Sequence, residues 1–179
     1  MFAYTLDNEI RLLLLHESMD KRLCQLVNEN RDYLTKWLPW VPNSQTPQHY
    51  QAYIKQSLTQ YANGQAMVCA IEYQGAIVGV GGFNSIDRHL SVAALGYWLG
   101  EAYQGNGVMT RVCQFLLDYA FDELQLSKVQ LAAAVGNKPS RQIAKRLGME
   151  LEGVIRRQEK VGDQVLDHAV YGILKEGRQ

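Results

Sequence analysis

Residues 92–123 read VAALGYWLGEAYQGNGVMTRVCQFLLDYAFDE and contain, in succession, a strand, a loop with two glycines and a helix. The apolar first part, residues 92–99, is typical of a buried strand. From about Gly107 onward the apolar residues recur at the spacing of one helical face: Val108, Val112, Phe115, Leu116 and Tyr119. Residues 104–107 therefore lie between the end of a strand and the start of a helix.

This loop has the composition of an anion site. The first turn of a helix leaves backbone N–H groups without partners and carries partial positive charge. Gly105 and Gly107 let the backbone approach a phosphate or pyrophosphate because no Cβ stands in the way. Glycines are also common in strand-to-helix turns that bind nothing, so the loop alone leaves both interpretations open. Two nucleotide motifs are excluded, because the chain lacks the P-loop lysine and a third glycine for a dinucleotide fingerprint.

Composition predicts one globular domain over residues 1–179, with 47% hydrophobic residues, 20% charged residues and a formal net charge of zero. The zero charge and the lack of Lys/Arg runs argue against nucleic-acid binding, although a protein substrate stays possible. Three separated cysteines are typical of reduced core thiols in the cytoplasm. Four histidines without metal-ligand spacing give no reason to expect a metal. Neither a signal peptide nor a membrane span is expected.

The remaining pattern predicts an α/β (α+β) fold with a mixed, mainly antiparallel sheet of six or seven strands and helices on both faces. Helices are expected from Ser18, from Thr46-Pro47 and from Ser140, each with a hydroxyl side chain as the N-cap. Glycines at 79, 81 and 82 indicate a bulge or close backbone approach. The expected strands are residues 9–16, 66–73, 76–84, 92–99, 128–135, 153–161 and 164–174.

The order of elements places the glycine loop where the sheet changes direction. Strands 66–73, 76–84 and 92–99 form a meander, whereas the strand–helix–strand unit ending at 128–135 is expected to be parallel. Ligands of open α/β sheets bind at the carboxyl ends of strands where the topology changes. Upstream, Trp37 and Trp40 lie in a stiff aromatic segment, which indicates either packing between helices or an aromatic wall at a substrate entrance.

These residues resemble the GNAT superfamily of acyl-CoA-dependent N-acetyltransferases over most of the chain. Gln104 and Gly107 fit the family's Gln/Arg-x-x-Gly-x-Gly/Ala loop, whereas Met109 departs from its last position. The wider pattern is similar to ribosomal-protein N-acetyltransferases of the RimL and RimJ type. It is carried by residues 83–87, 97–99, 103–110 and 147–149, and by Asn137 and Ser140.

The resemblance implies acetyl-CoA as co-substrate, bound where two parallel strands splay apart, and implies no metal. It places Trp98 and Leu99 at the cofactor, with the Leu99 backbone at the thioester end and Asn137 on the pantetheine. Trp37, Trp40 and Asn84 would contact the acceptor substrate. The diphosphate would receive N–H groups from Gln104, Gly105, Asn106, Gly107, Val108, Met109 and Thr110.

Acetyl transfer to an amine needs a base, N–H donors at the carbonyl and a proton source for the leaving thiolate. Many GNAT enzymes use a tyrosine as that acid, but Ala144 stands at the corresponding position here. The ribosomal-type branch implies Ser140 as the acid and Glu159 as the base. The alternatives are that Ser140 is only a helix cap and that Glu159 lies on a solvated strand face.

The expected reaction is acetylation of a protein N-terminal α-amine, with a ribosomal protein as one candidate acceptor. A small amine such as a polyamine, an aminoglycoside or an amino acid is the second possibility. A non-catalytic acyl-CoA-binding protein is the third, because the usual tyrosine is absent. The resemblance also suggests a homodimer.

Overall fold

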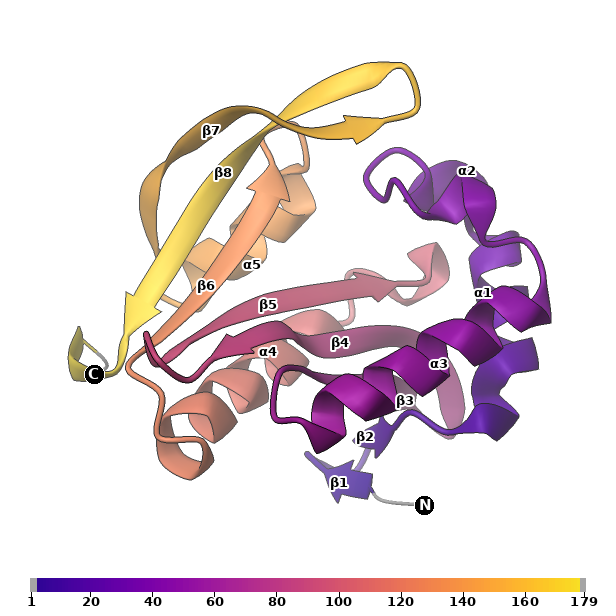
Figure 1. The fold of residues 1–179 in the computed structure, drawn as a ribbon, viewed down its shortest axis with the longest axis horizontal. Helices are drawn as coiled ribbons and strands as arrows, with labels where there is room; N and C mark the ends of the chain where they lie inside the picture. Colours follow the sequence, from indigo (N-terminus) through magenta and orange to yellow (C-terminus); the bar gives the residue numbers. More distant parts are fainter. Residues whose placement is uncertain (1–2, 178–179) are drawn as a thin grey trace.

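The computed structural model describes residues 3–177, which form one mixed sheet of eight strands in the order β1-β2-β3-β4-β5-β6-β8-β7 (Figure 1). Only β5 and β6 pair in parallel within these residues, and every other neighbouring pair is antiparallel. The predicted fold class is confirmed, with the three-residue β1 as a strand not expected from the sequence. The strands are β1 (Ala3–Thr5), β2 (Ile10–Leu14), β3 (Met67–Tyr73), β4 (Ala76–Asp87), β5 (Val92–Leu99), β6 (Lys128–Ala134), β7 (Glu150–Val161) and β8 (Gln164–Leu174).

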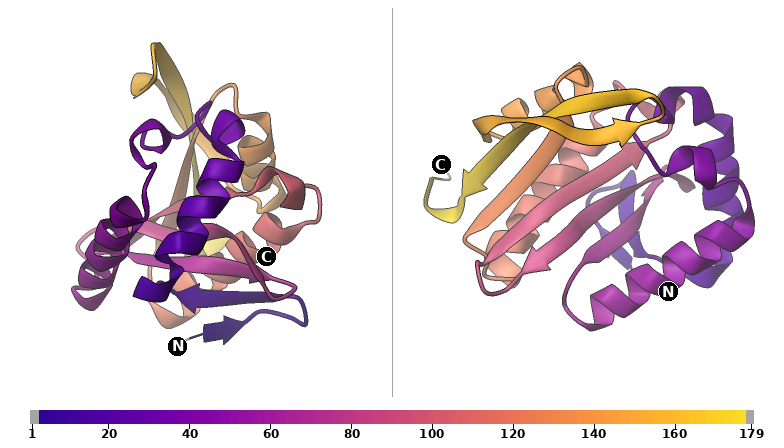
Figure 2. Two further views of the ribbon diagram at one scale, coloured as in Figure 1. Left: turned by 90° about the vertical axis from the view of Figure 1, so that its right-hand side faces the viewer. Right: turned by 45° about the horizontal axis from the view of Figure 1, so that its top comes forward.

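Helices cover both faces of the sheet, as expected (Figures 1 and 2). The side chains of β2 and β3 alternate between the two faces, so Leu12 and Leu13 belong to different cores. The first core joins α1 (Asp20–Glu29) and α3 (Pro47–Ala62) to the sheet, with α2 (Arg31–Leu34) at its end. The second core joins α4 (Val108–Asp118) and α5 (Lys138–Arg146) to the opposite face.

Helices form near all three predicted starts, but Ser18 and Ser140 are not the caps, and Thr46 is the N-cap residue of α3 without the expected side-chain hydrogen bond to the backbone. Ser18 lies within a 3-10 turn whose cap is His16, and its own amide donates to the His16 ring. The Thr46 hydroxyl pairs with His49 Nδ1 at 3.0 Å, rather than with a backbone amide. In α5 the cap is Asn137, whose Oδ1 accepts from the Ser140 amide at 3.3 Å. Asn caps a helix as well as Ser does, and a proline in the first turn favours the earlier start.

Glycines in β4 allow a close approach of neighbouring backbones, as predicted. A Cβ on Gly82 would overlap the Met67 carbonyl and lie 2.9 Å from Val68 Cα in β3. A Cβ on Gly79 would overlap the Trp98 carbonyl in β5. Glycine is therefore required at these two positions by the strands on either side of β4.

The parallel pair at the centre of the sheet separates halfway along its length. Pairing runs from Val92 opposite Lys128 to Leu95 opposite Leu131 and ends there. Beyond that point β5 stays paired only with β4, and β6 stays paired with β8. Figure 1 shows the two strands diverging toward their carboxyl ends. The expected splay is thus present, and it opens at the loop that precedes α4.

Candidate active site

A cavity of about 820 Å³ lies at the open end of the splay. Its walls come from α2 and the segment after it, from the end of β5 with the start of α4, and from the start of α5. Eleven of the residues singled out in the sequence line it: Trp37, Trp98, Leu99, Gln104, Gly105, Gly107, Val108, Met109, Thr110, Asn137 and Ser140.

The glycine loop presents bare backbone to this cavity. Gly105 and Gly107 have φ angles of +80° and +71°, which favour glycine, and no heavy atom lies within 4 Å of either Cβ position. The first α4 hydrogen bond runs from the Arg111 amide to the Gly107 carbonyl at 3.1 Å. The three amides before Arg111 consequently lack helical acceptors. In the described chain the first turn of α4 carries no acidic residue. This arrangement fits the diphosphate of coenzyme A.

Side chains on both sides fix the shape of the loop. Asn106 does not line the cavity, because its amide nitrogen folds back and donates to the carbonyls of Tyr103 and Gln104 at 3.2 and 3.3 Å. Tyr33 of α2 hydrogen-bonds to the Gln104 side chain, and burial raises the pKa of the Tyr33 hydroxyl. The Glu101 amide donates to Asn30 Oδ1 at 2.8 Å. The loop is therefore joined to the first helical layer before any ligand binds.

The hydroxyl of Ser140 meets a second hydroxyl that the sequence analysis missed as a site residue. Tyr97 of β5 lies with its Oη 2.9 Å from Ser140 Oγ, and both residues line the cavity. Burial raises the pKa of Tyr97 well above its ordinary value, so its hydroxyl stays protonated and available as a donor. Ala144, at the position of the family's usual tyrosine, is fully buried in the core. A tyrosine hydroxyl thus reaches the site from the strand instead of from α5.

Aromatic side chains gather at the cavity rim. The Trp37 ring lines the cavity and lies 3.5 Å from the Cβ position of Gly136, in the segment between β6 and α5. Trp40 is 36% exposed, does not line the cavity, and packs on Trp98 with 6.2 Å between ring centroids. Trp37 and Trp98 are therefore wall residues, and Trp40 packs on the Trp98 ring without lining the cavity itself.

Glu159 and Asn84 lie outside this cavity. Glu159 is partly buried in β7, opposite Leu166 and next to a bulge where the Arg157 amide donates to Asp167 Oδ1 at 2.8 Å. Figure 1 shows the β7–β8 hairpin extending past the end of β6 toward the segment after α2. Asn84 is exposed at the bulge of β4, where its side chain covers Gly96 of β5.

Three cations on the cavity walls were also not singled out in the sequence: Lys138 and Arg146 of α5, and Arg111 of α4. Lys138 and Arg146 suit a phosphorylated ligand, whereas Arg111 is ion-paired with Asp7 and Glu9. Within residues 3–177, no group of three His, Cys, Asp or Glu side chains is arranged to hold a metal ion. Over the same residues, no helix combines the length and apolarity that crossing a membrane requires.

Comparison with known protein families assigns the fold to a family. Residues 10–150 match the model of the acetyltransferase (GNAT) domain. The chain belongs to the GNAT acetyltransferase family, and the resemblance seen in the glycine loop is confirmed.

Individual proteins that resemble this chain include ribosomal-protein acetyltransferases. The putative ribosomal N-acetyltransferase YdaF of Bacillus subtilis is 32% identical over 176 residues, which cover 98% of this chain and 96% of YdaF. The structure of RimL, a ribosomal L7/L12 alpha-N-protein acetyltransferase in complex with coenzyme A, superimposes with a TM-score of 0.93 at 25% identity, covering 97% of this chain and 98% of RimL. The microcin C7 self-immunity acetyltransferase MccE, in complex with acetyl-CoA and AMP, gives a TM-score of 0.89 at 29% identity over 94% of each chain.

Proposed function

We propose that this protein transfers the acetyl group of acetyl-CoA directly to the N-terminal α-amine of a protein, with ribosomal proteins as the first candidates. One observation carries the proposal: a bare glycine loop at the start of α4 opens into a cavity along the splay of β5 and β6. The similarity to RimL and YdaF over nearly the whole chain supports the choice of acceptor.

The residues that line the cavity suit distinct parts of acetyl-CoA. The amides of Gly107, Val108, Met109 and Thr110, together with Gln104 and Gly105 of the loop, would hold the diphosphate. Asn106 would contribute by fixing the shape of the loop. The Leu99 backbone and Trp98 border the splay, where unpaired strand edges offer hydrogen bonds to the pantetheine arm. Asn137 already uses its Oδ1 as the α5 cap, which leaves its amide nitrogen for the pantetheine.

The hydroxyl pair suits the proton donor. The amine forms a bond to the thioester carbonyl carbon, the carbon–sulfur bond breaks, and the departing sulfur takes a proton. In this proposal Ser140 Oγ donates that proton and regains one from solvent, to which the base releases the proton it takes from the amine. Tyr97 donates a hydrogen bond to Ser140 Oγ as negative charge develops there. Tyr97 is suited to this because its raised pKa keeps the hydroxyl neutral.

The proposed base and acceptor contacts come from other parts of the chain. An α-amine has a pKa of about 8, so a base removes its proton more readily than that of a lysine. Glu159 is our proposed base, supported by its place on the hairpin that extends over the cavity end of the sheet. Trp37, Trp40 and Asn84 are proposed acceptor contacts, of which Trp37 has the strongest support because it lines the cavity.

Acceptor screening tests the proposal. Purified protein and acetyl-CoA are incubated with peptides that have a free N-terminal Ser or Ala, with the same peptides blocked at the N-terminus but containing Lys, and with small amines. Free thiol release together with the gain of one acetyl group, detected by mass spectrometry, is expected for the free peptides alone. Acetylation confined to Lys or small amines would refute the α-amine acceptor. Coenzyme binding without turnover on any amine would favour the non-catalytic alternative.

A small-molecule acceptor is the second candidate. MccE, which has a similar fold and is 29% identical to this chain, was crystallised with AMP. We also propose that the protein acts in the cytoplasm, since its three cysteines are free and buried. A homodimer and independence from nucleic acid complete the proposal. Light scattering and a nucleic-acid binding assay test these two points.

A further inference from the structure

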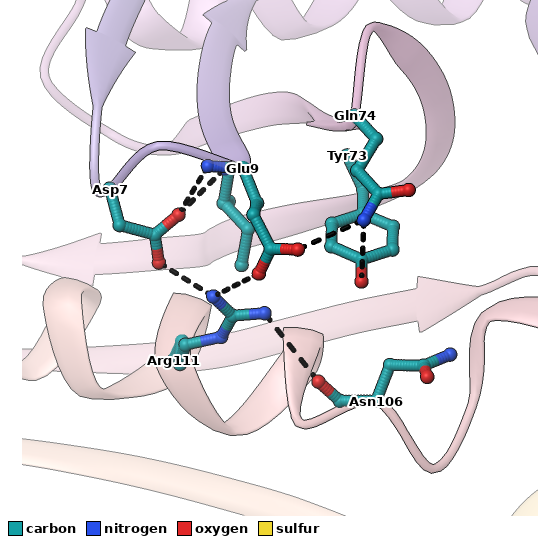
Figure 3. A network of polar contacts seen from close by, with 7 residues as sticks. Asp7, Glu9, Tyr73, Gln74, Asn106 and Arg111 are labelled. Atoms are coloured by element: carbon teal, nitrogen blue, oxygen red, sulfur yellow. Dashed lines mark hydrogen bonds and ion pairs between the residues drawn. The ribbon is translucent and has the colours of Figure 1, made fainter.

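Arg111 lies in the first turn of α4, four residues after Gly107, and connects the glycine loop to Asp7 and Glu9 near the start of the chain (Figure 3). Its Nη1 donates to Asp7 Oδ2 at 2.8 Å and to Glu9 Oε2 at 3.0 Å. Its Nη2 donates to the carbonyl oxygen of Asn106 at 3.5 Å. The guanidinium therefore contacts two carboxylates and the backbone of the loop at once.

The two carboxylates are themselves held in place, as Figure 3 shows. Asp7 Oδ1 accepts the amides of Glu9 and Ile10, each at 2.8 Å, which fixes the turn between β1 and β2. Glu9 Oε1 accepts from Gln74 Nε2 at 2.9 Å, in the turn between β3 and β4. Two turns of the sheet thus orient the guanidinium through its carboxylate partners.

The contact between Arg111 and the Asn106 carbonyl determines the direction in which the Gly107 amide points. In a trans peptide the C=O and the following N–H point in opposite directions. Because the Asn106 carbonyl is directed toward Arg111, the Gly107 N–H is directed away from Arg111. Gly107 lines the cavity and Asn106 does not. This contact therefore favours the loop orientation in which the Gly107 amide is offered to a ligand.

Charge argues against a direct role for Arg111 as a phosphate ligand, even though it lines the cavity. Its single positive charge faces the negative charges of Asp7 and Glu9, so the cluster as a whole is negative. A diphosphate gains little attraction from a cation that is already paired with two carboxylates. The contribution of Arg111 must then be made through the shape of the loop.

We propose that Arg111, Asp7 and Glu9 form a clamp that positions the Gly107 amide for the diphosphate of acetyl-CoA. The proposal rests on the proposed function insofar as the cavity binds that coenzyme. Arg111 is a positioning residue here, and Asp7 and Glu9 act through it.

Calorimetric titration with coenzyme A alone tests the clamp without any acceptor. We expect Arg111→Gln to weaken binding about tenfold. The double variant Asp7→Asn with Glu9→Gln separates the two roles of Arg111. A clamp predicts weaker binding, by about threefold to tenfold, because the guanidinium loses its orientation. A direct phosphate ligand predicts tighter binding, because a cation is released from its carboxylates.

Two further variants sharpen the result. Arg111→Lys keeps a point charge but loses the planar fork, so a clamp predicts affinity between wild type and Arg111→Gln, whereas a direct ligand predicts nearly full affinity. Arg11→Gln is the matched control, because it removes a bidentate ion pair with Glu72 on the same sheet, at 2.6 and 2.9 Å, away from the loop. Its affinity for coenzyme A should match that of wild type.

Steady-state kinetics give an independent readout. With a clamp, Arg111→Gln raises KM for acetyl-CoA while kcat at saturation stays within about twofold of wild type. An unchanged coenzyme affinity in Arg111→Gln, with wild type binding normally, overturns the clamp alone. Failure of wild type to bind coenzyme A overturns the proposed function instead. Thermal unfolding of each variant confirms that it is folded before titration.

Discussion

Replacing Tyr97 by Phe removes one hydroxyl from the cavity wall and leaves the aromatic ring that packs there. The lost contact is the 2.9 Å hydrogen bond to Ser140 Oγ. A neutral hydrogen bond contributes about 0.5–1.5 kcal/mol, and 1.36 kcal/mol corresponds to a tenfold change in rate. If the whole bond acts in the transition state, kcat of Tyr97→Phe falls between about twofold and twelvefold.

The double-mutant cycle with Ser140→Ala identifies the route of this effect. Tyr97 acts only through Ser140 in our mechanism, so Tyr97→Phe should leave kcat unchanged in the Ser140→Ala background. The assay is the initial rate of thiol release at saturating acetyl-CoA, with the acceptor found by screening. An equal loss of kcat in both backgrounds, or no loss in either, would refute the reasoning.

Stability measurements test whether a loss of kcat in this cycle results instead from a loss of folded protein. Among the described residues, Ser140→Ala leaves the partly buried Tyr97 hydroxyl with the Ser140 carbonyl, at 3.5 Å, as its remaining hydrogen-bond partner. We expect this variant to lose about 1 kcal/mol of unfolding free energy, whereas Tyr97→Phe in the same background should recover part of that loss. Denaturant unfolding of all four proteins supplies these values.

Three more predictions concern stability. In denaturant titration, Gly82→Ala should lower the unfolding free energy by about 1–3 kcal/mol, because its Cβ would overlap β3. The control Gly153→Ala should change it by less than about 0.5 kcal/mol, because no atom lies within 4 Å of its Cβ position. Asn137→Ala should cost about 1 kcal/mol through loss of the α5 cap, and Asn137→Ser should restore most of it; equal losses would contradict the capping role. The pKa of Asp7 is lowered, mainly by the Glu9 amide, and that of Glu9 is lowered, mainly by Gln74. These carboxylates therefore stabilise the fold above their unfolded pKa values of about 4 and lose this effect as the pH falls, so thermal unfolding of Asp7→Asn should converge on that of wild type under acid.

Much of the fold could be predicted because its signals are local. The strand at residues 92–99 has the predicted bounds, and the hairpin turn at Gln74-Gly75 has positive φ at both residues, as its sequence indicates. The place of the glycine loop at a change of topology follows from the order of elements, whereas the splay was expected only from the family resemblance. The short strand β1 could not be read from the sequence, because three exposed residues have no periodicity to detect.

The candidate site was predictable where a motif is continuous and where the family resemblance supplied a position, as for Asn137 and Ser140. Residues of the glycine loop were assigned to one place because they are neighbours in the chain. The pairing of Tyr97 with Ser140 joins residues 43 positions apart, and that of Arg111 with Asp7 joins residues 104 positions apart. Such pairs depend on the register of the sheet and the packing of α4, which no local pattern specifies. The base assigned to Glu159 depends likewise on how a bulged hairpin curves.

Because β5 and β6 stop pairing after Leu95, each has an unpaired edge inside the sheet. Past Leu95, successive β5 amides point in turn toward β4, where they are bonded, and toward the gap. Deuterium should therefore enter this half of the strand unevenly, with every second amide exchanging quickly in the free protein. A ligand bound in the gap would slow exchange at those positions alone, so the spacing of protected amides would show that it lies along the β6-side edge of the strand.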